Sequence, residues 1–532
     1  MKPLIAESNT DEMDIGFQCD NGVTLKEATL WYAAVTTPRT AAFSRSQHVG
    51  ISVFVFVSIL LLNLYAPAQP TILERLLASA IIVLSFVPAW YWVSGRDQNP
   101  PLLALVALLY AVYYALPIFL LGQYSRAWYL PDIIPATDIE KALGLSCLGL
   151  IAMMAGYSAR ITRMCSQFTP KLALQWHDPR AVRDIGFVLL VGGLLLRIIW
   201  FRYIAYNDSP GPVGASGVQQ LFYFLTEAPF VGLVMLWVLD LSGCLGPLSH
   251  KLLRFAIVPF FLVIGVATGT ITQAIRVGLL LLFIAAMLRR RIPWALLALG
   301  FASIFVLQPT KTMFRQDMDA QMVSGGNSVI GRARTFLELT YDTITGQSHL
   351  GADIVTISVD RLNLITTFAN VVEDTPVFIP YWHGYTYYPL FTKLIPRLLY
   401  PEKRQDVAGQ AFPRRYGFLS GGDFTTTYKL AQLTEAYINF GLPGVLIIMF
   451  VIGAIYRITQ EMFVHPMMGL GGVVALGYIV TQWLDIEANF SLTFGGLAYT
   501  LAYIGLVHIL VILVAAPRYR GHSETVGNPS LK

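Results

Sequence analysis

The stretch AYINFGLPGVLIIMFVIGAIY occupies residues 436–456 and contains no acidic or basic side chain. An α-helix needs about 20 such residues to cross the hydrocarbon core of a lipid bilayer. Similar stretches recur along the chain, which is 55% hydrophobic and only 13% charged. That charged fraction is about half the value typical of soluble domains. The sequence therefore predicts an all-α protein, a polytopic bundle of transmembrane helices.

Apolar runs of roughly 17–23 residues predict about 12 spans. They are Val49–Tyr65, Leu76–Val93, Leu102–Leu121, Ala142–Ser158, Ile185–Tyr203, Leu221–Leu241, Leu252–Thr270, Ile275–Leu288, Ile292–Gln308, Ala436–Tyr456, Met467–Leu484 and Leu492–Ala516. The eighth is short, and its boundary with the seventh is open. A polar segment, residues 309–434, separates the spans within 49–308 from those within 435–516.

Basic residues predict the orientation of the bundle, since connections rich in Lys and Arg stay in the cytoplasm. One connection holds Arg160, Arg163, Lys171, Arg180 and Arg183, another holds Arg289, Arg290 and Arg291, and Arg457, Arg518 and Arg520 follow later. Residues 206–218 contain no Lys or Arg. The alternation places the tails 1–48 and 517–532 in the cytoplasm and the segment 309–434 outside. The N-terminal tail has no apolar core, so it is not expected to be a cleaved signal peptide.

Charged residues inside spans are costly and often functional. Five charged residues within or at the ends of the predicted spans stand out, namely Arg197, Glu227, Arg276, Asp485 and Glu487. On the predicted topology all of them lie in the outer half of the membrane. This one-sided placement predicts a polar cavity beneath the long outer segment. A plain ion pair between Arg197 and Glu227 that ties two helices together is the alternative for those two residues.

The outer segment alternates amphipathic stretches with turns. Apolar spacing over 336–341 and 354–371 predicts helices lying on the membrane surface. Aromatic residues then crowd together at Tyr381, Trp382 and Tyr385. Such a cluster forms either an interfacial belt or a platform on which sugar rings stack.

Basic residues in the same segment stand among prolines and aromatics. Arg397 follows Pro396, and Arg414 and Arg415 follow Pro413. Guanidinium groups bind phosphate oxygens in a bidentate manner. Stiff, apolar surroundings favour positioned anion-binding residues over a solvated charged face, which is the alternative.

Several short strings in this order resemble one family of membrane enzymes. They are Arg276–Leu280 (RVGLL), Arg361–Leu364 (RLNL) running to Asp374–Pro376 (DTP), Ile395–Lys403 (IPRLLYPEK) and Glu435–Gly441 (EAYINFG). Together they resemble the bacterial O-antigen and exopolysaccharide repeat-unit polymerases (Wzy-like proteins) and, more distantly, the O-antigen ligases. The resemblance covers residues 268–489.

The resemblance implies a metal-independent glycosyltransferase at the periplasmic face of the bacterial inner membrane, with no cofactor. Its donor and acceptor would both be glycans on undecaprenyl diphosphate, and its product O-antigen, capsule or exopolysaccharide. It implies as partners the lipid bilayer, a chain-length regulator and a flippase, and no nucleic acid.

Roles for individual residues follow from that chemistry. Cations that could hold the diphosphate are Arg276, Arg361, Arg397, Arg414 and Arg415, of which Arg276 would also stabilise the leaving group. Tyr381, Trp382 and Tyr385 could stack on sugar rings. A base for the attacking hydroxyl could be Glu435 or His383, ranked ahead of Asp423. Alternatively, Glu435 is a first-turn acid of a helix that Thr434 caps.

Two other functions remain open. An O-antigen ligase, which transfers glycan to the lipid A core, would use the same outward site. A transporter or flippase for the lipid-linked glycan would need charges through the whole membrane depth and internal repeats. The one-sided charges and the absence of an evident repeat favour the enzyme.

Overall fold

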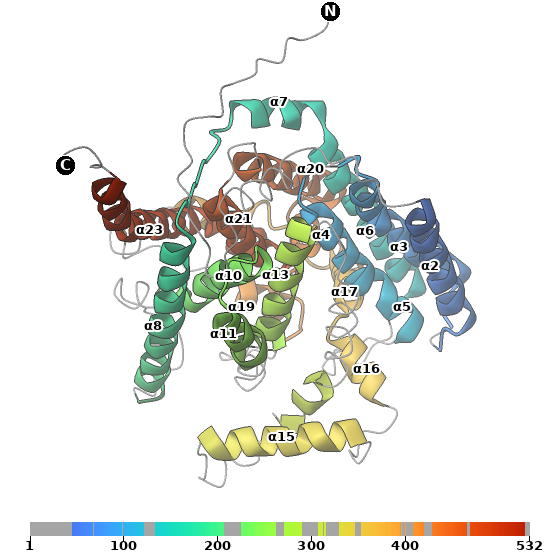
Figure 1. Ribbon diagram of the computed structural model, residues 1–532. Helices are drawn as coiled ribbons and strands as arrows, with labels where there is room; N and C mark the ends of the chain where they lie inside the picture. Colours follow the sequence, from blue (N-terminus) through green and yellow to red (C-terminus); the bar gives the residue numbers. More distant parts are fainter. Residues whose placement is uncertain are drawn as a thin grey trace, which may run out of the picture.

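The computed structural model of the chain contains helices and connections (Figure 1). It describes residues 45–67, 69–97, 99–121, 134–206, 225–261, 271–289, 307–311, 313–314, 329–345, 353–393, 395, 400, 408–419, 428–464 and 469–526. No strand occurs among these residues, so the predicted all-α class is confirmed for them. Arg397, Asp423 and residues 292–306 of the predicted ninth span lie outside the described part.

The helices have the following bounds, where η1 and η2 are π-helical turns and η3 is a 3-10 turn. They are α2 (Arg45–Leu64), α3 (Ile72–Val93), α4 (Leu102–Tyr110), η1 (Ala111–Ala115), α5 (Leu116–Leu120), α6 (Ala136–Ser158), α7 (Arg160–Phe168), α8 (Pro179–Tyr206), α10 (Ala228–Leu241), α11 (Pro247–Leu252), η2 (Leu253–Ile257), α13 (Ile271–Arg289), α15 (Val329–Thr345), α16 (Asp353–Asp360), α17 (Leu364–Asp374), η3 (Tyr385–Tyr387), α18 (Tyr388–Lys393), α19 (Ala408–Arg415), α20 (Gln432–Phe463), α21 (Leu470–Trp483), α22 (Phe490–Gly495) and α23 (Leu497–Val526).

Five helical segments in the described part are long and apolar enough to cross a membrane. They are Ile72–Val93, Leu102–Leu120, Ala136–Ser158, Gln432–Phe463 and Phe490–Ala516. Three shorter apolar helices cover Ser52–Leu64, Ala228–Leu241 and Leu470–Trp483. The membrane character of the chain is therefore supported, but length and composition support five spans there and not the predicted twelve.

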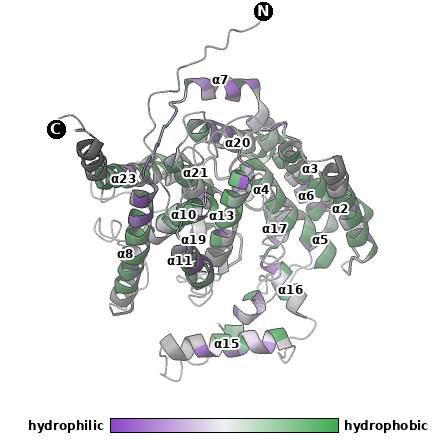
Figure 2. Cartoon of the chain, in the orientation of Figure 1, coloured by the Kyte–Doolittle hydropathy of each residue, from purple (hydrophilic) through white to green (hydrophobic). Residues whose placement is uncertain are grey.

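Two polar helices lie at opposite ends of the bundle. In Figure 1, α7 runs across the top of the molecule and α15 across the bottom, with the apolar helices between them. Figure 2 shows hydrophilic residues on both, whereas α3, α5 and α23 are mostly hydrophobic. The connection that contains α7 and the long polar segment that contains α15 therefore project from different ends.

Glycines bring the central helices of the bundle into close contact. A Cβ atom on Gly156 of α6 would lie 1.9 Å from the carbonyl oxygen of Phe450, and one on Gly453 of α20 would lie 1.9 Å from that of Met153. Small residues let two helix backbones approach in this way, and dispersion contacts along the seam then hold membrane helices together. The backbones of α6 and α20 are thus in close contact at these two glycines. This contact is here called the seam of the bundle.

The long polar segment does not lie wholly on a surface. Residues 354–371 form two helices, because Asn363 caps the start of α17 by accepting the N–H of Thr366 at 3.1 Å. Leu364 and Phe368 of α17 are buried, and the helix packs against α6. The predicted surface helix is therefore wrong for α17. An amphipathic pattern shows that one face is buried, but not whether lipid or protein covers it.

Candidate functional site

Helix α20 starts in the polar segment. It begins at Gln432, about one turn before the predicted span, and its N-cap residue Ala431 makes no side-chain capping bond. The predicted capping by Thr434 is therefore wrong. Thr434 lies inside the helix, is buried, and its hydroxyl interacts with Tyr114 of η1.

A break divides α20 into a short N-terminal part, residues 432–440, here called the outer half, and a longer apolar part, residues 442–463, here called the membrane half. Gly441 has φ 63° and ψ −145°, a conformation outside the helical region, which glycine adopts most readily. A Cβ atom there would also lie 2.7 Å from the hydroxyl oxygen of Tyr381. Pro443 has no N–H group, so the carbonyl of Asn439 loses its usual partner four residues on, and the break likewise frees the carbonyl of Ile438.

Residues 381–388, here called the aromatic segment, donate hydrogen bonds to these two carbonyl groups of α20. The N–H of Trp382 donates to the carbonyl of Ile438 at 2.9 Å, and that of His383 donates to the carbonyl of Asn439 at 3.2 Å. Because buried backbone groups need partners, the break in α20 creates the place where the aromatic segment binds. The sequence separates these two pieces by more than 50 residues, yet the structure joins them through their main chains.

Glu435 lies on the outer half of α20 and is fully buried. Its carboxylate accepts the backbone N–H of Phe490, the first residue of α22, at 2.5 Å. Asn489 caps the same helix by accepting the N–H of Leu492 at 3.2 Å. Burial, and then the charge of Glu435, raise the pKa of Tyr387 in the aromatic segment well above 10. Glu435 thus joins α20 to α22 and lies close to the aromatic segment.

A second group of charges, here called the carboxylate network, lies just before α22. Glu487 accepts two bonds from Arg361, at 3.0 and 2.8 Å. Lys429 contacts Glu487 at 3.0 Å and both oxygens of Asp485 at 3.1 Å. The hydroxyl of Tyr113, from η1, also interacts with Glu487. The network therefore connects two parts of the polar segment, η1 and the turn that follows α21.

Electrostatics favour the charged forms of Glu487 and Arg361. Burial raises the pKa of Glu487, but the attraction of Arg361 and Lys429 outweighs it and lowers the pKa to about 2. Burial likewise lowers the pKa of Arg361, and Glu487 reverses that effect and raises it. The bidentate pair is the strongest charge-assisted geometry available to a carboxylate.

A third group, here called the guanidinium pair, contains two Arg residues and one acid. Arg197 and Arg276 each lie 3.5 Å from a different oxygen of Glu227. Both guanidinium groups also lie over the ring of Phe230, at 4.7 and 5.2 Å from its centroid. Arg276 donates to the hydroxyl of Thr481 in α21 at 3.3 Å. These three charged side chains carry one more positive than negative charge.

The five charged residues singled out within the predicted spans thus gather around one end of α21. Thr481 contacts the guanidinium pair, and Asp485, one turn later, belongs to the carboxylate network. The predicted ion pair between Arg197 and Glu227 exists, and Arg276 joins it. The ion-pair interpretation is therefore confirmed, and the polar cavity beneath the outer segment stays a prediction.

The aromatic segment and the end of α19 form the most exposed part of the site. Arg415 lies over the ring of Trp382 at 4.9 Å and donates to the carbonyl of Pro380 at 2.9 Å. Trp382 is only 7% exposed, whereas Tyr385 is 51% exposed. Among the three predicted stacking residues, Tyr385 therefore offers the most accessible ring, and Trp382 supports Arg415.

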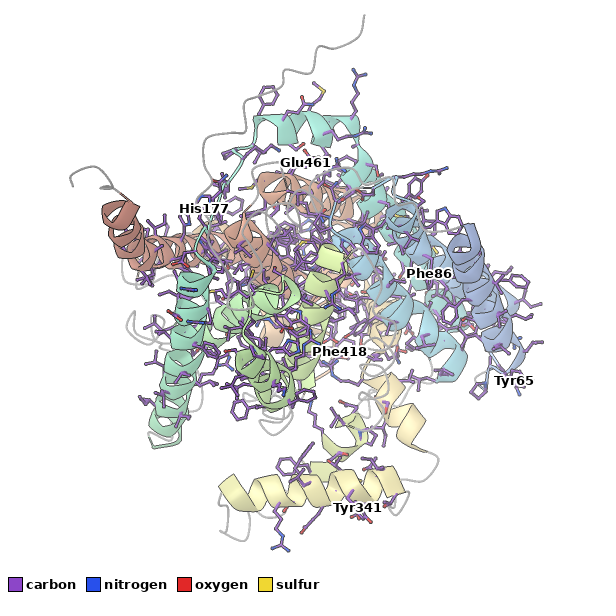
Figure 3. The ribbon with its side chains drawn as sticks, viewed as in Figure 1. Tyr65, Phe86, His177, Tyr341, Phe418 and Glu461 are labelled. Atoms are coloured by element: carbon purple, nitrogen blue, oxygen red, sulfur yellow. The ribbon has the colours of Figure 1, made fainter. Side chains whose placement is uncertain are left out.

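Two other predicted residues differ in their surroundings. The imidazole of His383 is exposed, whereas Arg414 is partly buried and donates to Gln410 of its own helix at 2.8 Å. The rings of Phe412, Phe418 and Tyr428 pack together, and Figure 3 shows Phe418 in the middle of the molecule. The aromatic residues after the Arg pair therefore build core and not surface.

Sequence reasoning missed several residues of this site. Lys429, Lys393 and Asn439 were not proposed for it, yet Lys429 completes the carboxylate network and Lys393 donates to the carbonyl of Ser491 in α22 at 2.9 Å. Asp485 and Glu487 were noted as membrane charges without a role. The sequence indicated a role only for these two acids, since carboxylates beside an apolar span need partners.

No group of three or more His, Cys, Asp or Glu side chains in the described part is arranged to hold a metal ion. Comparison with known proteins gives one match. A family model described as a domain of unknown function (DUF8712) is similar to residues 246–482, which include Arg276, Arg361 and Glu435. No curated protein and no solved structure matches the chain.

Proposed function

We propose that this protein is a membrane-embedded glycosyltransferase that polymerises oligosaccharide repeat units carried on undecaprenyl diphosphate. The product is a surface or secreted polysaccharide, and the reaction takes place at the periplasmic face of a bacterial inner membrane. The proposal includes the topology of about 12 spans with both termini in the cytoplasm. It also includes a flippase that supplies the substrate and a regulator of chain length.

The guanidinium pair is the observation that carries this proposal. Charge-assisted bonds between a guanidinium and a carboxylate are usually about 2.7–2.9 Å long. Glu227 instead lies 3.5 Å from both Arg197 and Arg276. An anion at this end of the bundle would be attracted by the two guanidinium groups, and a lipid diphosphate presents such an anion at the membrane surface.

The reaction needs no redox partner. The acceptor hydroxyl oxygen forms a bond to the anomeric carbon of the donor, and the bond from that carbon to the diphosphate oxygen breaks. The electron pair leaves with the diphosphate, whose charge Arg276 stabilises. The hydroxyl proton passes to His383, whose imidazole is exposed, while the buried Glu435 holds α22 in place.

The test is the length of the polysaccharide made in cells that carry Arg276→Ala. Loss of one charge-stabilising group commonly lowers turnover by about 100-fold or more, so we expect long chains to disappear while single repeat units remain. Arg334→Ala is the matched control, because Arg334 also pairs with a Glu but is 80% exposed on α15. Normal chain length in Arg276→Ala, at wild-type protein level, would refute the diphosphate role.

Deleting the gene separates the competing functions. A polymerase deletion leaves single repeat units on the cell surface lipid. A ligase deletion leaves finished polymer on the carrier lipid, and a flippase deletion leaves the lipid-linked unit in the cytoplasmic leaflet. Either of the last two outcomes would overturn the proposal.

A further inference from the structure

His383 has an unusual backbone. Its φ is +49°, in the left-handed region, which costs free energy for a residue other than glycine. Gly384 follows with φ +86°. Strained residues of this kind persist only where their surroundings hold them, and they concentrate at functional sites.

One buried residue holds this strained turn. Asn439 is fully buried, and its carbonyl accepts the N–H of His383 at 3.2 Å. Its side-chain oxygen accepts the N–H of Gly384 at 2.8 Å. Its side-chain nitrogen donates to the hydroxyl of Thr386 at 2.7 Å and to the carbonyl of Glu435 at 2.8 Å. Asn439 therefore binds the two peptide groups that flank the Cα atom of His383.

The position of Asn439 on α20 makes this possible. Its carbonyl is available because Pro443 cannot donate an N–H, and its side chain reaches back one turn to Glu435. The side-chain amide of Asn439 thus contacts both the helical turn that contains Glu435 and the turn that contains His383.

We propose that Asn439 is a positioning residue that holds His383 in its left-handed conformation and so sets where the imidazole lies at the site. The catalytic role of Asn439 rests on the proposed function, but its effect on the backbone conformation of His383 does not. A buried Asn that only satisfies its own hydrogen bonds would be the alternative, and it would not act through His383.

Thermal unfolding of the purified protein in lipid nanodiscs tests the holding without any substrate. Glycine tolerates φ +49° better than alanine, so His383→Gly should melt about 1–3 °C above His383→Ala. Asn439→Ala keeps the backbone bond to His383 but removes the side-chain bonds to Gly384 and Thr386, so in that background we expect the difference to vanish. An undiminished difference would overturn the proposal. If Asn439→Ala does not accumulate, Asn439→Ser replaces it, because the shorter side chain no longer reaches Gly384.

Asn63 of α2 provides a matched control. Its side-chain nitrogen also donates to a carbonyl one turn back, Ile59 at 2.8 Å, and to a hydroxyl on another helix, Ser79 at 3.2 Å. Asn63→Ala loses the same two donor bonds far from His383. The difference between His383→Gly and His383→Ala should stay unchanged in that background.

Polymer synthesis then tests the catalytic meaning. Displacing a reacting group by about 1 Å can lower turnover about 100-fold, so Asn439→Ala should reduce the rate about 10- to 100-fold. In the His383→Ala background the same change should cost less than about 3-fold, because coupled residues are not additive. Equal losses in both backgrounds, or full activity of His383→Ala, would show that Asn439 does not act through His383. If the protein does not synthesise polymer, the melting comparison still tests whether Asn439 holds the conformation of His383.

Discussion

Glu487→Gln removes the central charge of the carboxylate network while keeping the shape of the side chain. Glu487 is only 4% exposed and accepts two bonds from Arg361. The interval between its ordinary pKa of 4.5 and its value of about 2 corresponds to about 3 kcal/mol of stabilisation. Breaking a buried ion pair by removing one partner costs about 3–5 kcal/mol. Because Lys429 keeps Asp485, we expect about 3 kcal/mol.

Thermal unfolding in nanodiscs, followed by tryptophan fluorescence, measures this loss as a midpoint lowered by about 3 °C. Glu338→Gln is the matched control, since Glu338 also pairs with an Arg at 2.8 Å but is 59% exposed. Water screens that pair, so we expect almost no change. Removing both partners with Arg361→Gln and Glu487→Gln should restore part of the stability. A midpoint for Glu487→Gln as high as that of Glu338→Gln would refute the reasoning.

Three further predictions follow from the same structure. The pKa of Glu487 is lowered on folding, so its stabilisation should be complete above about pH 4.5 and disappear as the pH falls towards 2; unfolding midpoints across that range, compared with Glu487→Gln, measure it. Gly453→Leu should prevent accumulation of folded protein, because a Cβ atom would lie 1.9 Å from a carbonyl oxygen on α6. Gly192→Leu, where a Cβ atom has no neighbour within 4 Å, should accumulate normally. The yield of folded protein in size-exclusion chromatography measures both. Gly441→Ala should lower the unfolding midpoint and polymer synthesis together, and Tyr381→Phe, which removes the closest atom, should recover only part, because φ 63° remains unfavourable.

Local sequence properties predicted much of the helical framework. Uncharged runs marked α3, α6 and the membrane half of α20, because hydropathy alone decides whether a helix can lie in lipid. Local periodicity could not show that α17 enters the bundle. The break at Gly441 was also missed, although Gly and Pro beside each other are its local signal.

The site was harder to predict than the framework, because its contacts join distant residues. Arg361 was expected to bind a ligand, but it forms a bidentate pair with Glu487, which is 126 residues later in the chain. Glu435 was expected to act as a base or a first-turn acid; it does lie in the first turn of α20, but its bond to the N–H of another helix was not foreseen. Only the tertiary structure shows which of several charged residues become partners.

The bond between Glu435 and Phe490 also has a consequence for biosynthesis. The two residues are 55 positions apart, so at about 5–20 residues per second the ribosome adds Phe490 roughly 3–11 s after Glu435. The membrane half of α20 can meet α6 as soon as it inserts, since α6 is already made. The bond from Glu435 must wait for α22, so the contact between α6 and α20 can form during translation before the site is completed.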